Sequence, residues 1–410
     1  MTTESAREAR HAALVRAIAW LGVLITAAIL LAASRYTSRD PDSTVYAEIS
    51  ARLSALPFSG WIAPDWGGSW GFSGPFREHP IGIFVLPALL ARAGYPAAQA
   101  AFAVGAVFSV VSLWLIGRVA APLVKEHEAV AVQWAALILP IAFVYRVRAN
   151  QEYPVLVLTL LALYATHRSR RAAVWIAGVV SAACGLALVK GIFVVFQPVV
   201  CALWLLLIRD ALPGDREPSP RNDGAAWLGL VCGLAAVAAL AWAYERMYQQ
   251  VSGDSFMSFY LHDRIADNAG LVANRAFSLP AKLYNAVWYL ARVAWFAMPG
   301  SLALLLSVGR ARNAAIEDRR GLLFALLAAA VYVAAMSLGA NKADRFIFPA
   351  YFLVGTAGAL VAIRRWPGVD RVAQRLAALP PHALPLAWLL FFILTLATER
   401  RLPYVKLWST

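Results

Sequence analysis

Stretches of about 20 almost uninterrupted apolar residues recur along the whole of this chain. The hydrocarbon core of a bilayer is about 30 Å thick, and an α-helix crosses it in about 20 residues. Because backbone polar groups find no water there, a spanning segment must be a helix or part of a closed β-barrel. Barrel strands alternate apolar and polar residues, whereas these runs are continuously apolar. The sequence therefore predicts an all-α, polytopic integral membrane protein.

Composition and charge agree with a membrane protein. Of the 410 residues, 61% are hydrophobic and 15% are charged, with a net charge of +14, whereas soluble domains are nearer half apolar and a quarter charged. The basic residues lie in short loops between apolar runs, where they contact lipid headgroups and fix topology. Nucleic acid is thus not an expected partner, while a preference for an anionic lipid substrate stays open. The cysteines lie in apolar runs and form no disulfide framework or zinc spacing.

The apolar runs define the expected membrane helices. The first run is longer than the apolar part of a signal peptide, so we expect an uncleaved helix that begins in the cytoplasm. Residues 81–90 are too few to span. The full-length runs cover residues 14–33, 97–117, 129–144, 153–166, 172–189, 192–208, 225–244, 286–308, 322–338, 346–363 and 384–398.

Basic clusters in very short loops set the predicted orientation. They include Arg168, Arg319 and Arg364, and such loops belong in the cytoplasm. All three fall inside if residues 80–92 re-enter the membrane rather than span it, a choice that the sequence leaves open. This solution predicts about eleven spanning helices. It places five polar segments on the outer face, at residues 34–79, 145–152, 190, 245–285 and 339–345.

The first outer segment carries two carboxylates at a predicted helix start. Asp40 followed by Pro41 is a good N-cap with proline at the first helical position. Asp42, in the first turn, either complements the helix dipole or serves as a general base at the membrane surface. Apolar residues then recur at helical spacing, which predicts an amphipathic helix on the membrane surface. They are Val45, Ile49, Leu53 and Leu56.

Five short motifs resemble those of the lipid-dependent membrane glycosyltransferases of the C superfamily (GT-C). Residues 42–47, Asp-Ser-Thr-Val-Tyr-Ala, resemble the Asp-Glu-x-x-Tyr-Ala element of the protein O-mannosyltransferase and aminoarabinose transferase branch. Four further elements resemble that branch in the same order. They are Glu78-His79-Pro80, residues 148–153, residues 185–191 and residues 342–349. Ser43 replaces the second acidic residue of the first motif, and Phe346 replaces a tyrosine of the last.

This resemblance implies an inverting glycosyltransferase of the cell envelope in a bacterial inner membrane, with its active site on the periplasmic face. The donor would be a sugar linked to polyprenyl phosphate, and the acceptor a protein, lipid or glycan. Residues 1–363 would form the catalytic domain, including the long outer loops at 34–79 and 245–285. Residues 364–410 would form a cytoplasmic connector, a last transmembrane helix and a short outer tail.

The predicted site residues follow from what such a donor needs. A leaving phosphate needs cations, and four lie at outer helix ends: Arg148, Lys190, Lys342 and Arg345. The acceptor needs a base, for which Asp42 is the first candidate and Glu78 the second. The predicted supporting residues are Asp40, Tyr46, His79, Glu152 and His262. The spacing of four between Arg148 and Glu152 predicts that these two pair on one helical face.

Two questions stay open at this level. His262 and Glu78 are of types that bind divalent metals, but one histidine with scattered acids gives no ligand spacing, so no metal is assigned and the cofactor is unknown. The alternative function is a polytopic transporter or lipid-linked-sugar flippase, which usually shows internal repeats and charges near mid-helix. An oligosaccharide polymerase or ligase would concentrate basic residues in a large loop of the second half. Here the carboxylates directly follow the first helix.

Overall fold

The computed structural model describes residues 3–121, 123–168, 172–208, 223–266, 278–307, 316–339 and 341–399. Regular structure in these ranges is helical, apart from one isolated β-bridge between Asp65 and Pro75, which confirms the all-α prediction. The α-helices are α1 (Thr3–Ala33), α2 (Pro41–Ala55), α3 (Gly82–Arg92), α4 (Ala97–Ala120), α5 (Glu126–Ile138), α6 (Pro140–Tyr145), α7 (Glu152–Arg168), α8 (Ala172–Lys190), α9 (Phe196–Leu207), α10 (Asp223–Ser252), α11 (Phe256–Phe259), α12 (Leu279–Phe296), α13 (Gly300–Ser307), α14 (Ile316–Ser337), α15 (Phe348–Arg365), α16 (Pro367–Ala377) and α17 (Ala383–Glu399).

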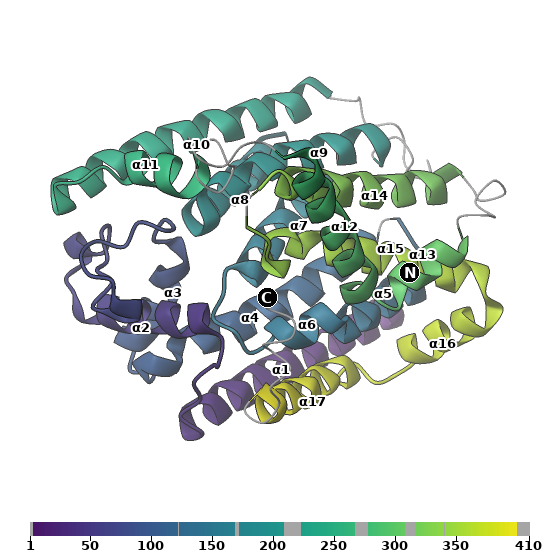
Figure 1. The fold of residues 1–410 in the computed structure, drawn as a ribbon. Helices are drawn as coiled ribbons and strands as arrows, with labels where there is room; N and C mark the ends of the chain where they lie inside the picture. Colours follow the sequence, from purple (N-terminus) through teal and green to yellow (C-terminus); the bar gives the residue numbers. More distant parts are fainter. Residues whose placement is uncertain are drawn as a thin grey trace.

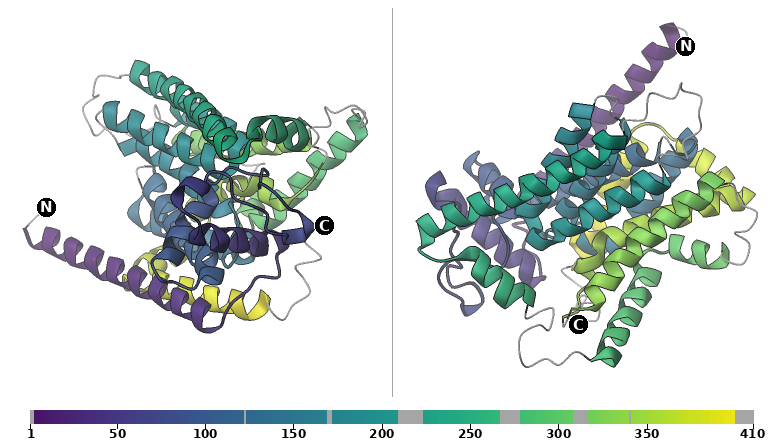
Figure 2. Two further views of the ribbon diagram at one scale, coloured as in Figure 1. Left: turned by 90° about the vertical axis from the view of Figure 1, so that its left-hand side faces the viewer. Right: turned by 90° about the horizontal axis from the view of Figure 1, so that it is seen from above.

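Most long helices run side by side as a bundle, with α2 and α3 at one end and α16 at the other (Figure 1). The central α4 packs against α5 and α7, and α8 lies between α7 and α10. The first helix lies along one side of the bundle against α17 and α4 (Figure 2). At the α16 end, the guanidinium of Arg364 donates hydrogen bonds of 3.0 and 2.9 Å to the carboxylate of Glu128, joining the end of α15 to the start of α5.

The surface of α1 is that of a helix in lipid. Five large apolar side chains at helical spacing are each 51 to 60% exposed: Leu14, Ile18, Leu21, Ile25 and Ile29. In water a continuous apolar stripe of this kind would be unfavourable, whereas lipid chains solvate it without cost. The side of α1 that carries Ala27 and Leu31 is buried against the bundle.

Six of the described helices are long and apolar enough to cross a membrane, or seven if the pair α12 and α13, bent by 108°, counts as one span. The count of about eleven spans is therefore not confirmed and stays a prediction. Several predicted runs are short or broken helices. The short helix α3, with 11 residues, lies where residues 80–92 were expected to re-enter. Residues 169–171, 209–222, 267–277 and 400–410, on which parts of the predicted topology depend, lie outside the described residues.

The predicted span at residues 129–144 is broken at Leu139 and Pro140. Proline cannot donate a backbone hydrogen bond to the preceding turn, so the last carbonyl groups of α5 need other donors, and none come from lipid. The buried guanidinium of Arg146 donates a hydrogen bond of 2.6 Å to the carbonyl of Leu137. The break and this bond fix the start of the segment at residues 146–151, which leads into the candidate site.

The helix α2 forms where it was predicted, but its apolar face packs on protein rather than on the membrane surface. Val45, Ile49 and Leu53 are each at most 2% exposed. They form a cluster with Phe76 and Phe84, so the loop before α3 and α3 itself cover this face. The prediction of a membrane-facing apolar side is therefore wrong. Periodicity shows that one face of a helix is buried, not what covers it.

Candidate active site

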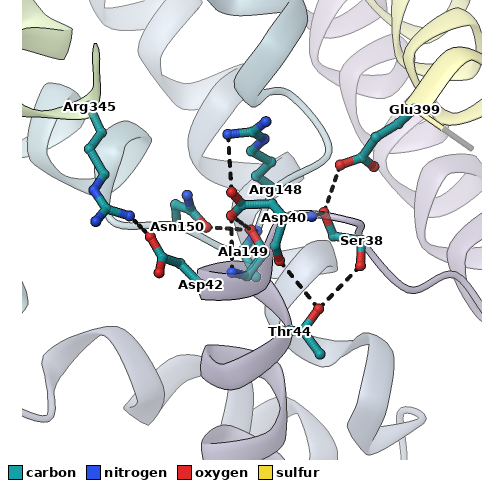
Figure 3. Close-up of polar contacts among 10 residues, drawn as sticks. Ser38, Asp40, Asp42, Thr44, Arg148, Ala149, Asn150, Arg345 and Glu399 are labelled. Carbon is teal, nitrogen blue, oxygen red and sulfur yellow. Dashed lines mark hydrogen bonds and ion pairs between the residues drawn. The ribbon is translucent and has the colours of Figure 1, made fainter. Parts of the chain in front are cut away.

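Four carboxylate–cation pairs gather at the α2 end of the bundle, and each joins two distant segments of the chain. Asp40 pairs with Arg148 at 3.3 Å, Glu152 with Lys190 at 3.1 Å, Asp344 with Arg292 at 3.3 Å, and Asp42 with Arg345. Figure 3 shows the two pairs at the start of α2. The predicted outer segments around residues 40, 148, 190 and 345 thus meet in space, as their assignment to one face required.

Asp40 caps α2 and also binds a buried arginine. Its backbone is extended (φ −72°, ψ 118°), and its carboxylate accepts hydrogen bonds from the Ser43 amide at 3.0 Å and the Ser43 hydroxyl at 2.7 Å. Burial raises the pKa of the Asp40 carboxyl, but the charge of Arg148 and hydrogen bonds from Ser43 and Asn150 outweigh burial and leave this pKa below its ordinary value. The capping prediction is confirmed. Asp40 also forms an ion pair with Arg148, which the sequence did not predict.

Ser43 joins the start of α2 to the loop before α7. It is fully buried, and its hydroxyl oxygen accepts a hydrogen bond of 3.2 Å from the Ala149 amide while also contacting the Asn150 side chain. A hydroxyl donates and accepts at once, so it satisfies both Asp40 and Ala149. The resembling family has an acidic residue here. In this chain an acid at position 43 would face Asp40 directly, and serine avoids that repulsion.

Asp42 differs from Asp40 in direction and in access. The side chain of Asp42 is 18% exposed and that of its partner Arg345 is 35% exposed, against 11% and 6% for Asp40 and Arg148. In Figure 3, Asp42 extends toward Arg345 and Asp40 toward Arg148. Residues two apart on a helix do not share a face. Asp42 is therefore the more accessible carboxylate of the two.

The predicted pair of Arg148 with Glu152 is wrong. Arg148 binds Asp40, and Glu152 binds Lys190, whose side chain is 4% exposed. The spacing rule requires a helix, but α7 begins only at Glu152 and the residues before it are not helical. The Nζ atom of Lys190 also lies 4.6 Å from the centre of the Phe193 ring. Lys190 is thus held between a carboxylate and an aromatic face.

Tyr260, from the segment at residues 245–285 that was predicted to be the second long outer loop, contacts this site. The Tyr260 hydroxyl accepts a hydrogen bond of 3.0 Å from the Ile192 amide and donates one of 3.3 Å to the Lys190 carbonyl. Between them, Gly191 has φ +55°, and a Cβ there would lie 2.2 Å from the Tyr260 hydroxyl. Only glycine fits both the left-handed backbone and this approach. The ion pair of Arg77 with Asp254 at 3.6 Å further joins this segment to the segment before α3.

The remaining predicted residues take no part in these four pairs. Glu78 and His79 are half-buried just before α3, and the His79 ring packs edge-on to Tyr46 with centroids 5.9 Å apart. The Lys342 Nζ lies 4.8 Å from the centre of the Tyr284 ring. His262 is exposed. Within the described ranges, no three His, Cys, Asp or Glu side chains gather as a metal-binding group.

Three charged residues near the site were not singled out as site residues from the sequence. Arg292 and Asp344 form one of the four pairs, and Glu399 accepts a hydrogen bond of 2.6 Å from Ser38. Asp344 directly precedes Arg345 in the last motif, which was an available signal. Arg292 and Glu399 lie in or at the end of apolar runs, where a charge is equally explained by contact with the membrane interface.

No protein-family model and no curated protein sequence matches this chain. Among solved structures, ArnT from Cupriavidus metallidurans in the apo state matches with a TM-score of 0.64 and 14% identity, over 95% of this chain and 78% of that one. This chain has the fold of ArnT. The structure of ArnT bound to undecaprenyl phosphate matches with a TM-score of 0.63 and 15% identity, over 93% of this chain and 77% of that one. The apo oligosaccharyltransferase of Archaeoglobus fulgidus, at 13% identity over 90% and 56% of the chains, has a TM-score of 0.46, which carries no argument.

Proposed function

We propose that this protein is a membrane glycosyltransferase that moves a sugar from a polyprenyl phosphate to an acceptor on the outer face of a bacterial inner membrane. The observation that carries the proposal is the pair of Asp42 and Arg345. This pair places an accessible carboxylate beside a cation, in a chain with the fold of ArnT. One of the matching ArnT structures is bound to undecaprenyl phosphate. Donor and acceptor would meet between α2 and the turn before α15.

The proposed reaction is a single displacement. An acceptor hydroxyl or amine forms a bond to the anomeric carbon of the sugar, and the bond from that carbon to the phosphate oxygen breaks. The electron pair leaves with the polyprenyl phosphate, and Asp42 takes the proton from the acceptor. Attack opposite the leaving group inverts the anomeric configuration. The leaving anion gains charge, which nearby cations stabilise.

The ion pairs suggest how phosphate would enter. Every cation of the four pairs already has a carboxylate partner, so a donor phosphate that binds one of them must compete with that carboxylate. Arg345 has the most exposed side chain of the paired cations, at 35%, and arginine binds two phosphate oxygens at once. When phosphate takes Arg345, the carboxylate of Asp42 is released from this ion pair. Donor binding would thus free Asp42 to accept a hydrogen bond from the acceptor.

The experiment is a transfer assay with the full chain in liposomes of defined lipid. Polyprenyl phosphates that carry a labelled sugar are offered with candidate acceptors, and released polyprenyl phosphate is measured. We expect release in wild type and loss of release in Asp42→Asn. Movement of labelled lipid across the bilayer without release of polyprenyl phosphate would favour a flippase and overturn the proposal.

A further inference from the structure

The last helix of the bundle carries a buried carboxylate that contacts the start of α2. Glu399, at the end of α17, is 3% exposed. Its Oε1 atom accepts a hydrogen bond of 2.6 Å from the hydroxyl of Ser38, which is 9% exposed. A buried carboxylate costs free energy unless it is hydrogen-bonded, and a charged acceptor makes a stronger hydrogen bond than a neutral one. This contact, the Ser38–Glu399 joint, therefore holds the end of α17 against the segment before α2.

The same hydroxyl also binds the backbone of the candidate site. The Asp40 amide donates a hydrogen bond of 3.1 Å to the Ser38 oxygen. A serine hydroxyl has one proton and two acceptor lone pairs. Because the proton points to Glu399, a lone pair is left for the Asp40 amide. Glu399 thus fixes the rotation of the Ser38 hydroxyl, and Ser38 fixes the Asp40 backbone (Figure 3).

The segment from Ser38 to Thr44 is closed by further bonds. The Thr44 hydroxyl lies 3.1 Å from the Ser38 carbonyl and 3.3 Å from the Asp40 carbonyl. Asp42 lies inside this closed segment, so its position depends on the same joint. The carboxylate of Asp42 must lie within hydrogen-bond reach of the acceptor to act as a base, and small displacements reduce turnover steeply.

We infer that Glu399 is a positioning residue for the candidate base: through Ser38 it holds the first turn of α2 so that Asp42 faces the acceptor. This inference rests on the proposed function for its effect on turnover, but its effect on the backbone of residues 38–44 can be measured without any reaction. Glu399 touches no reacting atom. It acts through Ser38 and Asp40.

The test compares Glu399→Gln, Glu399→Leu, Ser38→Ala and the double variant Ser38→Ala/Glu399→Leu. Glutamine keeps an acceptor oxygen, so we expect near-normal turnover. Loss of a hydrogen bond to a charged acceptor should lower kcat about tenfold in Glu399→Leu and in Ser38→Ala, with KM for the donor unchanged. The double variant should lose no more than either single one, because both break one chain of bonds. Additive losses, or an unchanged kcat in Glu399→Leu, would overturn the inference.

Two further measurements separate positioning from general packing. Thr395, one turn earlier on α17, is 1% exposed and bonds its own helix at the Phe391 carbonyl. Thr395→Val is the matched control, and we expect it to keep wild-type turnover. A tenfold loss there would mean that any change in α17 has this effect.

Hydrogen exchange measured by mass spectrometry should be faster in residues 38–44 of Glu399→Leu than in wild type. Unchanged exchange there refutes the joint even if no transfer reaction is found. Faster exchange together with an inactive wild type would uphold the joint and overturn only the proposed function.

Discussion

The guanidinium of Arg148 lies 3.3 Å from the carboxylate of Asp40, and both side chains are buried. This pair holds the loop before α7 against the first turn of α2, the turn that also carries Asp42. Asp40 is thus held in a buried ion pair, while Asp42, the proposed base, is more exposed. The two acids differ in exposure and partner, so matched substitutions should separate their roles.

We expect Asp42→Asn to lower turnover about a hundredfold or more with donor affinity little changed, because an amide does not accept the proton. Asp40→Asn keeps an N-cap but leaves Arg148 buried without its carboxylate, which should cost about 3 kcal/mol or more of stability. Transfer rate, donor binding and thermal unfolding of the two variants are measured side by side. Normal turnover in Asp42→Asn with a stable but inactive Asp40→Asn would reverse the assignment.

The lowered pKa of Asp40 gives a pH dependence with a defined sign. A carboxylate whose folded pKa lies below the unfolded value of about 3.9 adds stability above that value, and the gain is lost as pH falls through the folded pKa. Wild type should therefore unfold at a higher temperature than Asp40→Asn near pH 7, and this difference should shrink below about pH 4. A difference that stays constant from pH 7 to pH 3 would show that the charge of Asp40 adds nothing.

Several motif residues lie close together in the structure, but the motifs did not predict which of them pair. Asp42 and Arg345 were both expected on the outer face. This expectation depended only on counting how often the chain crosses the membrane before each residue. Which acid pairs with which cation depends on how the helices pack, and five α-helices, α2 to α6, lie between Asp40 and Arg148 in the sequence. The local rule that was available, a spacing of four, failed for Arg148 and Glu152 because that segment is not helical.

Glu399 shows a second limit. Nothing in the run of residues 384–398 distinguishes an acid at its end from one that only meets the interface. Its role depends on α17 lying against α1, a long-range contact that no local pattern encodes. The same holds for the apolar face of α2. The spacing of its apolar residues predicted that this face is buried, but that α3 covers it depends on tertiary packing.

The orientation in the membrane can be tested by cysteine labelling in a variant without the native cysteines. Ser73 is exposed in the predicted first outer loop, and Gly368 is exposed at the start of α16, with no atom within 4 Å of a built Cβ. We expect Ser73→Cys to react with an impermeant reagent in intact cells and Gly368→Cys only after permeabilisation. The opposite pattern would invert the topology and place the site in the cytoplasm.

The pair of Lys190 and Glu152 offers a charge-exchange test. Each side chain is at most 4% exposed, so a single reversal should destabilise the protein by about 3 to 5 kcal/mol. The double exchange Glu152→Lys/Lys190→Glu restores the attraction. If Lys190 binds donor phosphate, the double variant should regain stability but bind donor at least about tenfold more weakly. Full recovery of both stability and donor binding would mean that the pair is structural only.

A close backbone approach leads to the last prediction. Gly105 lies in α4, and a Cβ there would be 2.6 Å from the Arg148 carbonyl oxygen, so Gly105→Ala must move α4 away from the loop that carries Arg148. Alanine is more favourable than glycine in a helix by about 1 kcal/mol, so the change should not destabilise α4 itself. We expect a lower unfolding temperature and at least about a tenfold loss of turnover. Gly22→Ala is the control: this glycine also lies inside a helix, with nothing within 4 Å of a built Cβ, and the change should leave stability equal or raised by up to about 1 kcal/mol. If both variants behave alike, the approach of Arg148 to α4 does not constrain the site.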